Sequence, residues 1–528
     1  MSHHHRRPIA LAGVCLLSLG GGTLAHASEA PAASDGSGGD TIIVTGTRQT
    51  ARSATESMAP IDVLSAKDLQ ATGKQSVRDL LGTLLPSINV SNSGAGASFA
   101  VKTLSLRGLA GDHVLVLVNG KRRHNTATMF INGTTQNGQS PADLDLIPSN
   151  SIARVEVLRD GASAQYGSDA IAGVINVILK YDQSGTAGVT GGATRDGGGA
   201  SSRFTFDKGF AVGEGSIHLT AESWLQARTL RSAPNTAQFY ARLGQLFSAT
   251  TGTLDPREAT ADRNVNRGGQ PASEGVNLGY NAVMPVGNLV LYSFGTFSRR
   301  HNDAFLTYRV PDAPNNIPEL FPNGYSPHLH VRDHDYQFAG GIKSDADTWV
   351  KFDLSTSYGR DQSSYIETTA LNASLGPASP TTLYIGKVVS TEWTNNLDLQ
   401  KDIPLGLAEP LSLALGAEYR ESTYAIAAGE PASYIDGGYR STTGPNAGAL
   451  RTSGSQGVTG FAPSMAGKWG RNAWSFYVNA EQKVVPGVEL ALAGRHERYS
   501  DFGKTDTGKV SLRLEPMKGI ALRGTAST

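Results

Sequence analysis

From about residue 185 onward, apolar and polar residues alternate in a series of short segments. The pattern is clearest in residues 202–210, 216–224 and 288–298, where apolar or aromatic side chains recur with a period of two. A β-strand has this period, because its successive side chains point to opposite faces of the sheet. Similar segments lie at 335–343, 348–358, 390–400, 411–423, 473–484, 488–499 and 508–514. The pattern predicts a sheet of many strands.

The connections between these segments alternate in length. Residues 345–347 and 485–487 are tight turns, whereas the long links are rich in Gly, Pro, Ser and Asn. The long links are 229–274, 302–332, 362–388 and 427–471. A strand that crosses a membrane needs about 9 to 11 residues, and barrels of this kind join long loops on one side to short turns on the other. A soluble β-sandwich also alternates, but its loops do not usually run this long.

The region before the sheet has a mixed character. Residues 65–69 and 77–85 are typical of short amphipathic helices, and Pro86 ends the second one. Residues 104–109 and 114–121 are predicted to be buried strands, with a tight hairpin turn at Asn119 and Gly120. This part of the chain is therefore predicted to be an α+β domain.

Residues 147–180 are the most informative part of that domain. The first strand is expected to be half-buried, with Val155 and Val157 on one face. Gly161 and Gly167 bracket a segment that suits a single helical turn, because glycine tolerates positive φ. A second apolar run, 174–179, follows. Periodicity alone indicates only a strand, a turn and a second strand.

The N-terminus is typical of a secretory signal peptide. Arg6 and Arg7 precede an apolar run at 9–19, and Ala25 and Ala27 form a small-x-small cleavage pattern. The run is too short for a membrane helix, which needs about 20 residues. Cysteine occurs once in the sequence, inside the apolar run, which agrees with an exported mature protein.

Composition narrows the class of function. Lys plus Arg and Asp plus Glu are both 46, and no basic block breaks that balance, so we expect no nucleic-acid partner. The sequence shows no nucleophile elbow, no Walker loop, no His-Glu-x-x-His and no cysteine-based metal site. We therefore expect neither an enzyme nor a resident cofactor.

The order of residues in the 147–180 segment is more specific than its period. Arg154-x-Glu156-x-x-Arg159 followed by GASAQYGSDAIAGVINVILK closely resembles the plug domain of TonB-dependent outer-membrane receptors, which are energised importers of Gram-negative bacteria. LGAEYRES at 415–422 and RHERYSDFG at 495–503 resemble barrel strands of the same family.

The resemblance implies a transmembrane antiparallel β-barrel of the roughly 22-stranded type, with an N-terminal α+β plug domain. We expect about twelve strands and the start of a thirteenth, so the barrel is expected to be incomplete and the protein truncated at its C-terminal end. A non-functional fragment is one interpretation. The implied divisions are a signal peptide (1–27), a linker with the TonB box (28–47), the plug (48–182) and part of the barrel (183–528).

The resemblance also implies partners. The expected TonB box comprises Asp40, Thr41, Ile42, Ile43, Val44 and Thr45. Such an extended segment can add a strand to the sheet of a periplasmic partner, here TonB with its inner-membrane ExbB/ExbD complex. The alternative is an edge strand of the plug. Outer-membrane lipid and the barrel assembly machinery are the other implied partners.

By resemblance, an ionic latch would join the plug to the barrel. Its members would be Arg107, Arg154, Glu156 and Arg159 of the plug, with the arginines facing barrel acids at the positions of Glu418 and Glu481. A surface role for Glu481 is the alternative. Buried pairs of this kind suit a switch, because separating one side leaves an unpaired charge.

Ligand identity is less defined. Asn125, Asn132 and Gln136 lie in a polar, Gly-rich stretch expected at the plug apex, where they would touch ligand. His328, His330 and His334 are candidates for binding metal or haem, with a solvated loop or strand end as the alternative. The family makes a ferric siderophore the default cargo and leaves cobalamin, haem, oligosaccharide and peptide open. A passive porin or adhesin and a barrel hydrolase are alternatives from other classes.

Overall fold

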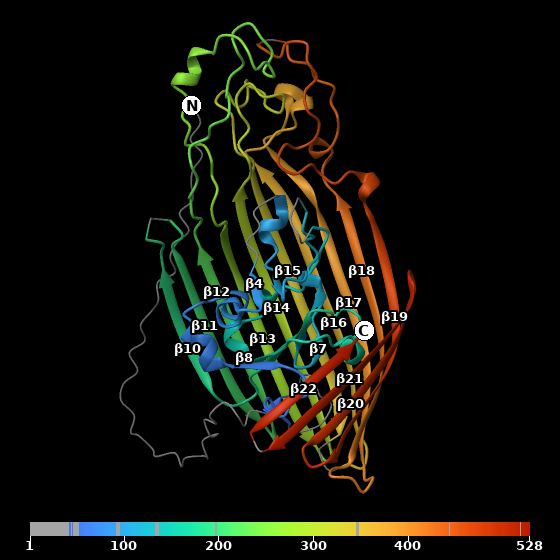
Figure 1. Cartoon of the computed structure of the whole chain (residues 1–528). Helices are drawn as coiled ribbons and strands as arrows, with labels where there is room; N and C mark the ends of the chain where they lie inside the picture. Colours follow the sequence, from blue (N-terminus) through green and yellow to red (C-terminus); the bar gives the residue numbers. More distant parts are fainter. Residues whose placement is uncertain are drawn as a thin grey trace, which may run out of the picture.

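The structure is a computed structural model. It describes residues 42–43, 45, 52–90, 96–131, 137–195, 198–344, 348–442, 444–517 and 519–528. Two main parts are visible: a large curved sheet, and a smaller mixed domain that lies within its curve (Figure 1). None of the helices in the described part of the chain has the length and apolar character needed to cross a membrane.

The large sheet contains 13 strands in sequence order, each antiparallel to its neighbours. The strands are β10 (Gly185–Gly192), β11 (Ser201–Val212), β12 (Gly215–Gln226), β13 (Ala272–Val286), β14 (Leu289–Phe305), β15 (His328–Ser344), β16 (Lys351–Thr368), β17 (Thr382–Ile403), β18 (Leu411–Ala428), β19 (Gly467–Val485), β20 (Val488–Tyr499), β21 (Gly503–Met517) and β22 (Ile520–Ser527). The predicted antiparallel barrel sheet is confirmed as a 13-stranded, incomplete barrel, with β10 and β22 as its edges.

All ten strands that the sequence predicts are present, and several extend further toward the long loops. Asn302 and Arg332, expected in a loop, lie within β14 and β15. The period of two missed β13 because Gly275 and Gly279 interrupt its apolar pattern. It missed β10 because that strand, GTAGVTGG, is half glycine. The tight turn at 485–487 is confirmed, with Gly487 at φ 81°, whereas 345–347 lie outside the described residues.

The two faces of the large sheet differ in chemistry. On β12, His218, Thr220 and Glu222 are buried toward the smaller domain, whereas Leu219 and Leu225 on the opposite face are 42% and 58% exposed. This alternation follows from the period of the strand. On this strand the inner face is therefore polar and covered, and the outer face is apolar and open.

The smaller domain is the predicted α+β plug. Its main sheet has the order β3-β8-β9-β6-β7, formed by β3 (Ile61–Ser65), β8 (Ile152–Leu158), β9 (Gly173–Leu179), β6 (Val114–Val118) and β7 (Lys121–Arg122). The expected hairpin between β6 and β7 is confirmed, with Asn119 at φ 48° and Gly120 at φ 78°. The expectation of a half-buried β8 was wrong, because both faces are covered and Glu156 is fully buried.

Short elements complete the domain. Helix α1 (Ala66–Ala71) starts at a capping box made by Ser65 and Asp68, and α2 (Val77–Leu84) starts at Ser76. The remaining elements of the plug are α3 (Ser163–Tyr166), β4 (Ile88–Val90) paired with β5 (Leu104–Leu106), β1 (Ile42–Ile43) paired with β2 (Arg52–Ser53), and the 3₁₀ turns η1 (Gly96–Ala100), η2 (Gly111–His113), η3 (Leu144–Leu146) and η4 (Ser149–Ser151). The predicted helices and the single turn at α3 are confirmed.

The long loops gather at one end of the sheet (top of Figure 1) and the short turns lie at the other. We call these the loop end and the turn end. The loops carry the 3₁₀ turns η5 (Pro256–Ala259), η6 (Ala373–Ala378), η7 (Pro431–Ser433) and η8 (Pro463–Met465).

Candidate functional site: the interface between plug and barrel

The turn after β8 is the point where the plug meets β18 to β20. Gly167 follows α3 with φ 107°, and a Cβ there would lie 3.1 Å from Glu497 Oε1. The next residue, Ser168, donates its backbone N–H to Glu497 at 3.0 Å, and its hydroxyl lies 2.6 Å from the Tyr499 hydroxyl. The positive φ therefore favours glycine at this position, and a Cβ would crowd the Glu497 carboxylate.

Asp169 links the plug to the barrel directly. Its Oδ2 accepts hydrogen bonds from Arg122 Nη1 of the plug at 2.6 Å and from Arg420 Nη1 of β18 at 2.7 Å. Burial raises the pKa of this carboxyl, but Arg420 and Arg122 outweigh that effect and hold the pKa well below its usual range. Asp169 is therefore a carboxylate shared between two guanidinium groups, one from each domain.

A second contact lies between the segment after β7 and the inner face of β15 and β16. Asp335 of β15 accepts hydrogen bonds from Arg123 and, at 2.6 Å, from His124 Nε2. Asp361 of β16 accepts from the Thr126 hydroxyl at 2.9 Å and from the Ala127 N–H at 2.7 Å. The two barrel acids therefore hold four residues of this plug segment by charge and hydrogen bonding.

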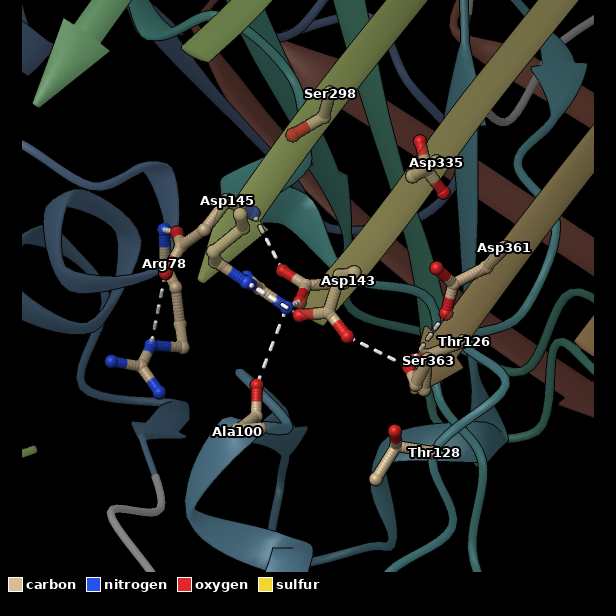
Figure 2. Close-up of polar contacts among 12 residues, drawn as sticks. Arg78, Ala100, Thr126, Thr128, Asp143, Asp145, Ser298, Asp335, Asp361 and Ser363 are labelled. Atoms are coloured by element: carbon tan, nitrogen blue, oxygen red, sulfur yellow. Dashed lines mark hydrogen bonds and ion pairs between the residues drawn. The ribbon is translucent and has the colours of Figure 1, made fainter. Parts of the chain in front are cut away.

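A third contact is centred on Arg300 of β14, and Figure 2 labels its plug partners Ala100 and Asp143. Its Nη2 donates to Asp143 at 2.7 Å and to the Ala100 carbonyl at 3.3 Å, and its Nε donates to Asp333 at 3.0 Å. Burial raises the pKa of Asp143 above its usual range, although Arg300 acts in the opposite direction. The guanidinium thus joins a plug acid to a barrel acid away from solvent.

Further ion pairs cross the same boundary around the plug. They are Lys121 with Asp353 at 3.0 Å, Lys180 with Asp207 at 3.0 Å, and Lys509 with Asp160 at 2.8 Å. Charged contacts therefore reach the barrel wall from β11 to β21.

The three latch arginines contact groups of the plug itself in this structure. Arg154 Nε pairs with Glu156 at 2.8 Å, and Arg159 Nε pairs with Asp62 at 2.7 Å. Arg107, at φ 57°, donates to the Arg159 carbonyl at 3.3 Å. All three contacts lie within the plug.

The two barrel acids of the expected latch lie elsewhere. Glu418 accepts from Asn396 at 3.0 Å and from Arg495 at 3.2 Å, and Arg495 also pairs with Glu497 at 2.9 Å. Glu481 is buried and lines a small cavity beside α3. The acids therefore flank the turn at α3 rather than the three arginines, and the latch role of these six residues stays a prediction.

Sequence reasoning missed the residues that make the contacts: Arg122, Arg123, His124, Asp143, Asp169, Arg300 and Asp335. Two signals were present. Four polar, mainly basic residues at 121–124 follow the Asn-Gly hairpin directly, and Asp333 and Asp335 occupy alternate positions of one strand. A cationic run beside a turn and carboxylates on one strand face together indicate a charged contact.

A cavity of about 500 Å³ opens at the loop end, between the plug and the inner face of β11 to β14. Six cationic and four acidic side chains line it, namely Arg78, Lys102, Arg203, Arg228, Arg267 and Arg300, with Asp79, Asp145, Glu222 and Asp303. Burial lowers the pKa of Lys102 to about 8, and Arg78 and Arg300 act in the same direction. The lining therefore has a cationic excess.

The other predicted site residues are placed as follows. Asn125 is exposed, between two residues that contact the barrel acids, while Asn132 and Gln136 lie outside the described residues. His328, His330 and His334 belong to β15, on its outer face. Asp40, Thr41 and Val44 also lie outside the described residues, whereas Ile42 and Ile43 form β1.

Thr45 is buried against the plug. Its hydroxyl donates to Glu156 Oε2 at 2.5 Å and accepts from Asn176 Nδ2 at 3.0 Å. Glu156 therefore holds both Thr45 and Arg154, and β8 and β9 together contact the end of the expected TonB box.

Comparison with known proteins agrees with this architecture. A Vitamin B12 transporter BtuB from Photobacterium profundum is 34% identical over 168 residues, which are 31% of this chain and 25% of that protein. The ferric enterobactin receptor PfeA from Pseudomonas aeruginosa, in a complex with enterobactin, has a TM-score of 0.60 at 16% identity, over 88% of this chain and 62% of that one. The siderophore receptor PirA from Acinetobacter baumannii has a TM-score of 0.57 at 16% identity, over 88% and 60%. The chain thus spans a quarter of the curated relative's length and about three-fifths of these receptors.

Two family models match successive parts of the chain. The TonB-dependent receptor plug domain matches residues 53–174, and the TonB-dependent receptor-like β-barrel matches residues 280–528. These matches coincide with the α+β domain and with most of the curved sheet. The chain therefore belongs to the TonB-dependent receptors, a family of outer-membrane barrel proteins.

Proposed function

We propose that this protein imports a scarce external ligand through the outer membrane of a Gram-negative bacterium, energised by TonB and its ExbB/ExbD complex. The observation that carries the proposal is the set of ion pairs that cross between plug and barrel, with Asp169 and the buried Arg300 at its centres. Charged groups regain hydration when they separate, so such an interface can open at lower cost than an apolar one of equal area.

The coupling segment is residues 40–45. Thr45 is held by Glu156 and Asn176, and Glu156 also accepts from Arg154. Within the proposal, ligand binding releases Thr45, and the freed segment adds as a strand to TonB. Arg154 and Glu156 thus act as a latch on the coupling segment, and Glu418 acts on the α3 turn through Arg495 and Glu497.

The proposed cargo is a ferric siderophore, and the cationic cavity is its binding site. An excess of guanidinium and ammonium groups favours an anionic ligand, and Arg binds carboxylate and similar oxygen pairs in a bidentate manner. The structural neighbours named as siderophore receptors support the same class of ligand. Cobalamin is a second candidate, favoured by the relative named as a vitamin B12 transporter.

Export completes the proposal. Residues 1–27 act as the signal peptide, the barrel assembly machinery inserts the sheet, and lipid covers its apolar outer face. The protein acts by binding and conformational change, without a covalent step.

The test separates uptake from binding. The protein with and without residues 40–46 is expressed in the outer membrane of a strain that lacks its own siderophore and cobalamin receptors. Uptake and surface binding are measured with ⁵⁵Fe-enterobactin and with radiolabelled cyanocobalamin. We expect the deletion to abolish uptake of one of these ligands while its surface binding is retained. Uptake that survives the deletion contradicts the energised importer.

A pair of lysine variants tests which ligand binds in the cavity. Lys102→Met, which removes a cationic group from the cavity, is compared with Lys504→Met on the exposed part of β21. We expect weaker binding of ferric enterobactin in the first variant only. Unchanged binding in both, with cyanocobalamin bound instead, favours the cobalamin candidate.

A further inference from the structure

Two histidines and an aspartate meet on the outer face of the barrel, apart from the plug interface. His301 and Asp303 belong to β14, and His330 of β15 lies directly across from Asp303 in the strand register. The alternate residues Arg300 and Leu329 are buried on the inner face. By the strand period the three side chains therefore lie on the face opposite to these residues, and Asp303 also lines the cavity at the loop end.

The ligand atoms of these three residues are close enough to share one ion. One atom from each lies within 4.8 Å of the others. His301 Nε2 and His330 Nδ1 are 3.3 Å apart. Two nitrogens bound to a tetrahedral Zn²⁺ at about 2.0–2.1 Å would be separated by about 3.3–3.4 Å. The observed spacing matches that geometry.

The opposite nitrogen of each imidazole is already held. His301 Nδ1 lies 3.3 Å from Glu274 Oε1, and His330 Nε2 lies 2.9 Å from the Thr368 hydroxyl. Metal-ligating histidines commonly use their second nitrogen in this way, because the contact fixes the ring orientation and the tautomer. Here the contacts come from β13 and β16, so four adjacent strands orient the pair.

Asp303 is held as well. Its Oδ1 accepts hydrogen bonds from Arg228 Nη2 at 2.7 Å and from His328 Nε2 at 3.0 Å. The carboxylate side chain is 19% exposed and that of His301 is 29% exposed. The cluster is therefore ordered by its neighbours and still reachable from solvent.

Exposed aromatic side chains indicate where the cluster lies relative to the membrane. Phe297, Phe338 and Tyr358 are 37%, 50% and 39% exposed on the outer face of β14 to β16. Exposed aromatic girdles lie at the interface between membrane and water. His301 and His330 are nearer the loop end than these residues. The cluster therefore lies on the aqueous side of the aromatic girdle.

We propose that His301, Asp303 and His330 bind a divalent transition-metal ion of the Zn²⁺ class, with water completing its coordination. Imidazole and carboxylate ligands suit Zn²⁺ and similar ions. The bound ion joins β14 to β15 at the base of the loop 306–327, so it stabilises the loop end by binding the folded form. Because the ion would bridge two neighbouring strands, its role in this proposal is structural and it is not the imported cargo.

Metal binding is measured on the purified protein, residues 28–528, in detergent after removal of metal with a chelator. This form lacks the three consecutive histidines at 3–5. Zn²⁺ affinity is determined by competition with a chromogenic chelator, and Co²⁺ is added to detect tetrahedral absorption bands. The variants are His301→Gln/His330→Gln and, as a matched control on the same strand and face, His334→Gln.

We expect one equivalent of Zn²⁺ in the wild type and in His334→Gln, and at least a tenfold loss of affinity in the double variant. Equal affinity in the double variant, or an equal loss in His334→Gln, overturns the proposal. A second measurement needs no variant: Zn²⁺ should protect His301 and His330 from modification by diethyl pyrocarbonate, read by mass spectrometry, and leave His496 reactive. Equal reactivity of all three with and without Zn²⁺ also overturns it.

Discussion

The interior of the plug is apolar, whereas its boundary with the barrel combines ion pairs with an apolar cluster that joins Phe99 and Ala127 of the plug to Leu329 and Val331 of β15. The plug sheet packs through Val155, Ile175 and Val177, which are fully buried in one apolar cluster. At the boundary, Asp143 is buried and Asp169 is 40% exposed, and both pair with arginines of the barrel. Only a small part of the apolar cluster, at Phe294 and Ala339, comes from the barrel.

This difference assigns separate tasks to the two kinds of contact. Apolar burial stabilises the plug by about 25 cal/mol per Å² and is lost only when surface is exposed to water. Ion pairs in a buried boundary add little net stability, yet they are costly to break on one side only. The plug is therefore expected to keep its own sheet while its contacts with the barrel are exchanged.

The largest effect is expected at Arg300. Arg300→Gln leaves Asp143 and Asp333 without their shared guanidinium and should lower the free energy of unfolding by about 3–5 kcal/mol. Urea titration of the purified protein in detergent measures it. Arg257→Gln, at an exposed loop pair with Asp255, is the control and should cost under about 1 kcal/mol. Equal costs in both variants would remove the distinction between buried and surface pairs.

The coupling segment comes next. Thr45→Val removes the hydroxyl that donates to Glu156 and should favour release of residues 42–45 by about 1.5–3 kcal/mol, the range for a hydrogen bond to a charged group. The only cysteine precedes residue 28, so Ile42→Cys offers a single site for a spin label. Its mobility should rise in Thr45→Val and stay unchanged in Thr83→Val, on the exposed face of α2. No rise would mean that Thr45 does not hold the segment.

A conservative change in the plug interior tests the other side of the comparison. Ile175→Val removes one methylene from the buried cluster and should cost about 0.5–1.5 kcal/mol of plug stability. Urea titration measures this cost, and the release of the spin label at residue 42 should not change. A clear change in that release would show that interior packing and boundary contacts are not separable.

The smallest effect concerns pH. Burial lowers the pKa of Lys102 to about 8, below its usual value, so the ammonium form loses its proton as pH rises through 8. An anionic ligand favours the charged form, and its affinity should therefore fall by about threefold between pH 7.5 and pH 9, within the tenfold per unit that one titrating group allows. Lys102→Met should flatten this dependence. A wild-type affinity that rises with pH would contradict the assignment.

Features of the fold could be predicted from the sequence when the residues that determine them lie close together in the chain. The period of two located ten strands, and the Asn119–Gly120 turn and the glycines around α3 are local features. The partners of Asp169 lie 47 and 251 residues away in the sequence. Such distances have no local signature, so the sequence did not single out these contacts. The histidine cluster was missed in part because His301 joins His330 only through the register of β14 and β15.

The central claim is that the plug keeps its sheet while its boundary changes. Asp169→Asn removes the charge of the carboxylate that Arg122 and Arg420 share. Amide hydrogen exchange of this purified variant is compared with that of the wild type. Amide exchange should be faster at residues 122–128 and 166–169, while the protection of β8 and β9 should not change. An equal loss of protection in β8 and β9 would contradict the central claim.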